Sequence, residues 1–217
     1  MYDEDAWVTY PHHHNWFNKL FVAEQMGYRC GPCGFAPSTS DYYIVRPIYN
    51  LGGMGVGTSI EFIEAGDFTK VPPGYFWCEV LLGKQYSATY EFKHGGIGNS
   101  KPYWEPIACW EGVKAPGSFS KFTKWTRSSY VPEVPRVFNV LSDVKRINVE
   151  FKGNSPFEVH LRDTPDPDYD ELIPIWEDNS NIINEMSMLS AQGYRWIESR
   201  DDSNGFLKPA RLGFMVR

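Results

Sequence analysis

Residues 146–161 read RINVEFKGNSPFEVHL, and this stretch decides the fold that we expect. Two β-rich runs, 146–151 and 156–161, are separated by Lys-Gly-Asn-Ser, a composition typical of a hairpin turn. Because side chains alternate between the two faces of a strand, residues of equal parity in each strand can converge on one face. The polar side chains placed there are Asn148, Glu150, Glu158 and His160.

This hairpin carries the residue types of a site that handles phosphate. One or two carboxylates and an amide are ligands that Mg²⁺ accepts when substrate phosphates complete its coordination, whereas His160 is a poorer ligand. The flanking cations Arg146 and Arg162 could neutralise a phosphoryl group during its transfer. The alternative is a cross-strand ladder of charges on a solvated face.

A glycine-rich loop at 50–58 precedes a predicted strand at 59–63. Residues 42–45 predict a strand that stops at Arg46 and Pro47, and residues 50–58 read NLGGMGVGT. Such a loop lets backbone N–H groups approach a phosphate closely, and Arg46 adds a cation beside it. The candidate phosphate contacts in the loop are Gly52, Gly53, Gly55 and Gly57. It is neither a P-loop nor a dinucleotide-binding turn, and a plain strand–turn–strand with a surface arginine is the alternative.

The other elements indicate an α+β chain. Periodicity and turn residues predict a helix over 15–27, a hairpin-like pair of strands over 75–82 and 85–92, and a short helix over 135–141. They also predict a helix over 182–192, followed by closing strands over 194–199 and 212–216. Residues 94–135 show little periodicity and predict irregular strands and loops.

Composition limits the class of protein. The 217 residues are 42% hydrophobic and 16% aromatic, which predicts a folded chain, and a net charge of −6 without a basic run disfavours dedicated nucleic-acid binding. There is no run of eighteen apolar residues, and the acidic start does not resemble a signal peptide. We therefore expect a soluble cytoplasmic protein that does not bind membranes, with four reduced cysteines.

Two short motifs indicate chemistry only weakly. Cys30-Gly31-Pro32-Cys33 matches the core of a thioredoxin redox motif, but a helix is predicted before it, and Gly34 and Pro37 interrupt the helix that should follow. The histidines at 12–14 are more typical of an exposed loop than of a metal site, since adjacent residues cannot all face one ion. Neither motif enters the predicted site.

The order of these pieces resembles the ATP-grasp superfamily of carboxylate–amine and carboxylate–thiol ligases. Residues 18–27, which include Lys19, are similar to the family's opening helix, and 44–48 with the glycine loop are similar to its lysine-bearing strand and phosphate lid. CEVLLGKQYS at 78–87 resembles the adenine-binding hinge, and 146–149 and 157–160 resemble the two metal-bearing strands. The resemblance runs from about residue 15 to residue 162.

The chain departs from the family pattern at several functional positions. Arg46 stands where the family has its strand lysine, and Gln85 stands where the acid that binds ribose is expected. Asn148 and His160 replace the metal aspartate and asparagine, which leaves Glu158 as the matching ligand, with Glu150 as a second carboxylate.

The resemblance implies one ATP-grasp-like domain over 1–217, in which two sheet-bearing subdomains sandwich a nucleotide. Its parts are an opening helical segment over 1–40, a lid over about 41–77, and a hinge with a C-terminal subdomain over about 78–217. The implied cofactors are ATP and Mg²⁺. The implied nucleotide contacts are Lys19, Arg46, Gly52, Gly53, Gly55, Glu79, Leu81 and Gln85, the implied metal ligands are Asn148, Glu150, Glu158 and His160, and the implied catalytic residues are Arg146 and Arg162.

The activity implied is ATP-dependent ligation, in which a carboxylate is activated as an acyl phosphate and attacked by an amine or another nucleophile. The alternative is a degenerate nucleotide-binding or interaction module without ligase activity. Because the chain begins close to the opening helix, the resemblance implies a compact form without the domain that usually precedes it, similar to uncharacterised bacterial and phage proteins. For such forms the implied partners are a nucleotide and an unidentified carboxylate and nucleophile, in the host cytoplasm if the chain is viral.

Overall fold

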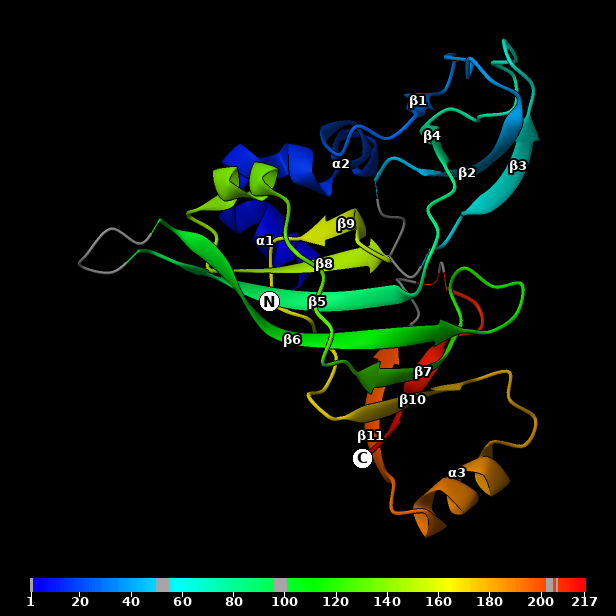
Figure 1. Cartoon of the computed structure of the whole chain (residues 1–217). Coiled ribbons are helices and arrows are strands. Elements are labelled where there is room, and N and C mark those ends of the chain that lie inside the picture. Colours follow the sequence, from blue (N-terminus) through cyan, green and yellow to red (C-terminus); the bar gives the residue numbers. More distant parts are fainter. Residues whose placement is uncertain (1, 50–54, 96–100, 202–204, 206) are drawn as a thin grey trace.

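The computed structural model describes residues 2–49, 55–95, 101–201, 205 and 207–217, whose strands form two antiparallel sheets (Figure 1). The smaller sheet has the order β1-β4-β2-β3, with strands at Cys30–Pro32, Tyr75–Glu79, Asp41–Pro47 and Ser59–Ile63. The larger sheet has the order β11-β12-β10-β7-β6-β5-β8-β9. From β5 to β12 its strands span Gln85–Lys93, Tyr103–Lys114, Phe122–Arg127, Arg146–Lys152, Ser155–His160, Glu171–Trp176, Arg195–Asp201 and Arg211–Val216.

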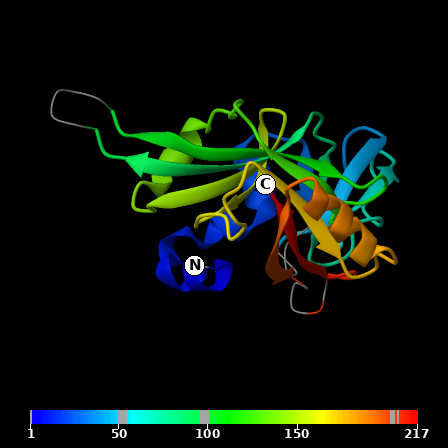
Figure 2. The same ribbon diagram turned by 90° about the horizontal axis from the view of Figure 1, so that it is seen from below.

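Helices pack at the two ends of the larger sheet, as the two views in Figures 1 and 2 show. At the β9 end lie η1 (Pro11–Phe17) and α2 (Lys19–Gln25), preceded by α1 (Asp3–Thr9). The short helix η2 (Arg136–Leu141) contributes Phe138 and Leu141 to the same core. At the other end α3 (Ile182–Ala191) packs on β11 and β12. No helix in the described residues has the length and apolar character needed to cross a membrane.

The hairpin predicted over 146–161 is confirmed as β8 and β9, with Gly153 in the turn. Ile147, Val149 and Phe151 are fully buried on one face, in the core cluster that includes residues of η1, α2 and η2. Since side chains alternate along β8, Asn148 and Glu150 point to the opposite face. The register pairs Asn148 with His160 and Glu150 with Glu158, so the predicted convergence of these four side chains is confirmed.

The helix predicted over 15–27 is wrong in extent, because Asn18 interrupts it. This residue has an extended backbone, with φ −88° and ψ 110°, and separates the 3₁₀ helix η1 from α2. Its side-chain oxygen accepts a hydrogen bond from the backbone N–H of Phe21 at 2.9 Å. An asparagine that caps the following helix cannot also continue the preceding one, so α2 begins at Lys19.

The predicted pairing of 75–82 with 85–92 is also wrong. Strand β4 pairs with β1 and β2 in the smaller sheet, whereas β5 pairs with β6 and β8 in the larger one. The residues between them therefore connect the two sheets instead of forming a hairpin turn. Gly83 has φ +110°, and a Cβ there would lie 2.8 Å from the backbone nitrogen of Gly153. This close approach fixes the connection against the turn between β8 and β9.

The prediction of irregular structure over 94–135 underestimated the order of this region. The twelve residues of β6 and the six of β7 lie at the centre of the larger sheet. The register of β6 on β5 shifts between Thr89 and Tyr90, opposite the stretch that contains Pro106, so the alternation breaks within the strand. Strand β10 and helix α1 were not predicted, whereas α3 and the closing strands β11 and β12 confirm the predictions near the end of the chain.

Glu171, the first residue of β10, allows the stability of this end of the larger sheet to be tested. The Glu171 carboxylate accepts hydrogen bonds from Lys124 Nζ at 2.6 Å, from the Tyr194 hydroxyl, and from Arg217 Nη2 at 2.5 Å. The bonds from Lys124 and Tyr194 outweigh desolvation and lower the pKa of Glu171 from 4.5 to about 2. A depressed pKa stabilises the fold above the unfolded-state pKa, and this contribution is lost as the pH falls toward the folded-state pKa.

Glu171→Gln is therefore expected to lower the free energy of unfolding at pH 7 by about 2 kcal/mol, the scale of hydrogen bonds to charged groups. The difference from the wild type should shrink as the pH falls from 4.5 toward 2. Urea denaturation at several pH values measures it, with Glu177→Gln, on a 40% exposed side chain, as the control. A difference that does not depend on pH would contradict the expectation.

Candidate functional site

A cavity of about 1450 Å³ lies between the two sheets, and its wall includes residues of both. Most side chains that the sequence singled out line it. These are Lys19, Arg46, Gly55, Glu79, Leu81, Gln85, Asn148, Glu150, Glu158, His160 and Arg162. Gly52 and Gly53 lie outside the described residues.

Arg146 is separate from this group. Its guanidinium pairs with Asp163 at 2.7 Å and with Glu91 at 3.3 Å, and it is not among the cavity-lining residues. The register explains the separation, because Arg146 lies opposite Glu91 near the far end of β5 from Gln85. The catalytic role predicted for Arg146 has no support from this position.

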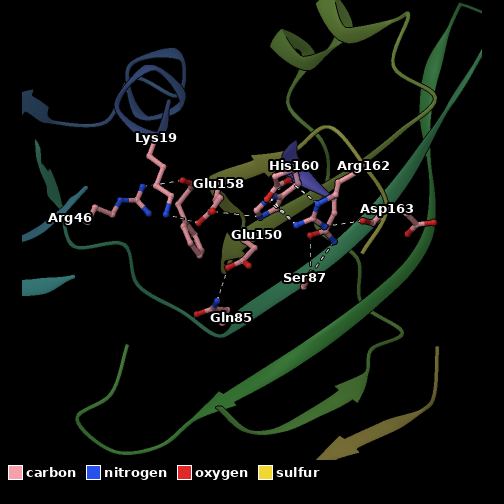
Figure 3. A network of polar contacts seen from close by, with 12 residues as sticks. Lys19, Arg46, Gln85, Ser87, Glu150, Glu158, His160, Arg162 and Asp163 are labelled. Atoms are coloured by element: carbon pink, nitrogen blue, oxygen red, sulfur yellow. Dashed lines mark hydrogen bonds and ion pairs between the residues drawn. The ribbon is translucent and has the colours of Figure 1, made fainter. Parts of the chain in front are cut away.

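A buried ion pair joins the N-terminal helices to the hairpin (Figure 3). Lys19, the first residue of α2, places Nζ 3.2 Å from Glu158 Oε2. Both residues are more than nine-tenths buried. The cap at Asn18 starts α2 at this point and so aims the lysine at β9. The structure thus neutralises the predicted metal ligand Glu158 with a cation of the chain.

His160 links Glu158 to an acidic residue that the sequence analysis did not single out. The His160 ring places Nε2 3.5 Å from Glu158 Oε1, and its Nδ1 donates to the Asp3 carboxylate, 3.0 and 3.1 Å from the two oxygens. Arg162 donates to the same carboxylate from Nε at 2.7 Å and from Nη2 at 3.0 Å. Burial opposes ionisation of Asp3, but His160 and Arg162 outweigh it and lower the pKa of Asp3. Burial likewise opposes protonation of His160, but Asp3 outweighs it and raises the pKa of the imidazole.

The second carboxylate of the hairpin has a neutral partner. Gln85 Nε2 donates to Glu150 Oε2 at 3.0 Å, as Figure 3 shows. Desolvation, together with repulsion from Glu158, raises the pKa of Glu150. Gln85 Oε1 is buried and has no hydrogen-bond partner among the described residues. A buried acceptor of this kind favours a ligand that donates a hydrogen bond.

Asn148 is held by two hydroxyl side chains of strand β5. Its Nδ2 donates to Ser87 Oγ at 3.0 Å and more weakly to Thr89 Oγ1 at 3.4 Å. The register of β8 on β5 places both hydroxyls beside the amide. Its side chain therefore belongs to a polar network on the face of the sheet that borders the cavity.

Arg46 is buried, so the surface-arginine alternative for this residue is wrong. Its Nη2 donates to the Phe157 carbonyl at 3.0 Å. Its guanidinium carbon lies 5.1 Å from the ring centre of Phe76 and 5.4 Å from that of Phe157. Its Nε is buried without a hydrogen-bond partner in the described part of the chain. A buried guanidinium with unsatisfied donor capacity favours an anionic ligand.

The loop that follows β2 meets a loop of the larger sheet at Gly55. This glycine has φ +71°, and a Cβ there would lie 2.7 Å from the Phe119 carbonyl oxygen. The same oxygen accepts a hydrogen bond from Lys114 Nζ at 2.6 Å. Burial lowers the pKa of Lys114 to about 8. Lys114 was missed because it ends β6, in the region where the sequence showed no strand periodicity.

The connection between the sheets forms another part of the wall. The Glu79 carboxylate accepts hydrogen bonds from the backbone N–H of Arg29 at 3.0 Å and from Arg29 Nε at 3.4 Å. Since this side chain already has a partner, the main chain around Val80 and Leu81 is the better candidate for contact with a ligand. This agrees with the hinge that the sequence suggested, and the assignment stays a prediction.

The predicted metal ligands share a face but do not form a ready metal site. No group of three or more His, Cys, Asp or Glu side chains in the described ranges is arranged to hold an ion. Glu158 contacts Lys19 and His160, while the amide of Asn148 bonds to Ser87. The donor set in this arrangement does not fit Mg²⁺.

Comparison with known proteins identifies the fold. No protein-family model matches the chain, and no curated protein sequence matches it. The structure resembles N5-carboxyaminoimidazole synthetase from Staphylococcus aureus complexed with ADP, with a TM-score of 0.51 over 92% of this chain and 66% of that one. The fold is ATP-grasp-like. The α+β class and the two sheet-bearing parts expected from the sequence are confirmed.

Two further comparisons give the extent of the similarity. Another structure of the S. aureus synthetase matches with a TM-score of 0.50 over 93% of this chain and 66% of that one. A protein from Archaeoglobus fulgidus that is described as a putative ATP-grasp superfamily protein matches with a TM-score of 0.36 over 69% of this chain and 46% of that one. Sequence identity is 12% in each case, and the chain spans at most 66% of each structure's length. The similarity therefore concerns the fold alone.

Proposed function

We propose that this ATP-grasp-like chain binds ATP between its two sheets and uses it to activate a carboxylate for attack by an amine or another nucleophile. The observation that carries the proposal is the cavity lined from both sheets, in which the cations Lys19 and Arg46 lie beside the carboxylates Glu150 and Glu158. The solved structure that supports it is an ADP complex of a synthetase with the same fold.

The residues of the cavity wall each have a role in nucleotide binding. Arg46 and Lys19 supply positive charge for the phosphates. Gly55 lets the loop backbone approach these phosphates closely, a role that the sequence predicts also for Gly52 and Gly53. The main-chain N–H and C=O groups of residues 79–81 form hydrogen bonds with the edge of the adenine ring. Gln85 accepts a hydrogen bond from a ribose hydroxyl through Oε1, which has no partner within the described ranges.

When bound, ATP supplies the phosphoryl group that turns the substrate carboxylate into an acyl phosphate, from which the nucleophile displaces inorganic phosphate. The chain contributes positioning and fixed charge, which provide most of the rate in phosphoryl transfer. Lys114 adds a further cation to the same cavity, on the side of the larger sheet.

A second candidate is a nucleotide-binding module without ligase activity. The observation that favours it is the saturation of the predicted metal ligands by other groups of the chain. Lys19 neutralises Glu158, and the Asn148 amide bonds to Ser87. An ATP site without bound metal would hold the nucleotide but transfer its phosphoryl group poorly.

Two measurements separate these candidates. Isothermal titration of ATP, with and without Mg²⁺, reports binding, and ADP release with pooled carboxylic acids, amino acids and amines reports turnover. ADP release that requires both a carboxylate and a nucleophile supports the ligase. Binding without turnover on any acceptor supports the module, and an absence of nucleotide binding would contradict both.

A further inference from the structure

The Asp3 carboxylate is held in the way that proteins bind a free carboxylate. Arg162 meets its two oxygens with two N–H groups, at 2.7 and 3.0 Å, which is the forked geometry of specific carboxylate recognition. His160 donates to the same group from the other side. The side chains of Arg162 and His160 are each only 10% exposed, whereas that of Asp3 is 30% exposed. The two receptor side chains are thus fixed, and the carboxylate lies at the edge of the site.

This carboxylate lies close to the groups proposed to bind phosphate. Asp3, His160 and Arg162 line the same cavity as Lys19 and Arg46. A single imidazole ring separates Asp3 from Glu158, which pairs with Lys19. A carboxylate that is to receive a phosphoryl group must be anchored beside the nucleotide phosphates. The position of Asp3 meets this requirement, although Asp3 belongs to the chain itself.

We propose that Arg162 and His160 form the subsite for the carboxylate substrate, and that Asp3 occupies it as a stand-in for that substrate. The inference rests on the proposed function, and it assigns Arg162 to the group that becomes the acyl phosphate. Exchange of Asp3 for a substrate carboxylate preserves the charge and the two hydrogen bonds at Arg162. The substrate must compete with a tethered carboxylate, which weakens its apparent affinity.

The exchange does not require α1 to leave the fold. Ala6 is fully buried in the core, and the Trp7 ring stacks on His14 at 3.7 Å between ring centres. These contacts hold the helix while the Asp3 side chain rotates away from Arg162. If Asp3 only anchored α1, its removal would change stability without creating a binding site for carboxylates.

Asp3→Asn tests the proposal with sodium acetate as the probe. The amide keeps the shape of the side chain but leaves the charge of Arg162 uncompensated, so we expect acetate to bind the variant at least tenfold more tightly than it binds the wild type. Glu4→Gln is the matched control, because it removes the same charge from the neighbouring residue, which also lines the cavity. Asp3→Asn combined with Arg162→Gln should abolish the gain. Acetate affinities that are equal in Asp3→Asn, Glu4→Gln and the wild type would overturn the proposal.

Titration of ATP into the same proteins separates the subsite from the proposed function. ATP binding with unchanged acetate affinity would contradict the subsite alone, whereas tighter acetate binding without any ATP binding would contradict the proposed function alone. If Asp3→Asn does not fold, NMR of the wild type gives the answer. The Arg162 Nε–H signal should shift in acetate relative to chloride at equal ionic strength, and an unchanged signal would overturn the proposal.

Discussion

Lys19→Met is expected to lower the free energy of unfolding by about 3 kcal/mol, the scale found when one partner of a buried ion pair is removed. Methionine keeps the apolar stem of the side chain, so the decrease in the free energy of unfolding reflects mainly the removal of the charge. Glu158 would lose its ammonium partner while Glu150 remains opposite it across the hairpin. Lys19→Met combined with Glu158→Gln should recover most of the loss, because the amide carries no charge that needs compensation.

Urea denaturation at pH 7 measures this effect. Lys145→Met is the control, since this lysine is exposed and should change stability by less than about 0.5 kcal/mol. If Lys19→Met were as stable as Lys145→Met, the buried pair would not contribute to the fold. Titration of ATP into folded Lys19→Met then tests the proposed phosphate contact separately from stability.

The hairpin that carries Glu150 and Glu158 could be predicted from the sequence because its determinants are local. Strict alternation and a Gly-Asn turn specify both the strands and the face that each side chain takes. The contact of Asp3 with Arg162 spans 159 residues, and no local pattern encodes such a separation. Sequence reasoning also paired β4 with β5, because neighbouring strands often pair. Only tertiary packing assigns them to different sheets.

Arg46→Met is expected to weaken ATP binding about 30-fold, equivalent to about 2 kcal/mol for a lost charge-assisted contact. Truncation of an arginine that is exposed at a strand end would affect ligand binding much more than folding, because an exposed charge contributes little to stability. The structure changes this expectation, because the guanidinium is buried and lies over the rings of Phe76 and Phe157. Arg46→Ala would leave a cavity between these rings, so it is expected to lower stability as well as affinity.

Methionine separates the two effects, because it fills the space between the rings without the charge. We expect Arg46→Met to melt closer to the wild type than Arg46→Ala does, while both lose ATP affinity. Arg46→Lys keeps the charge but lacks the forked N–H donors of the guanidinium, so it should retain part of the ATP affinity. Thermal melts and ATP titrations of the three variants measure both quantities. An Arg46→Met protein with wild-type ATP affinity would show that Arg46 only supports the packing of β2 against β9, since its hydrogen bond to the Phe157 carbonyl already joins these strands.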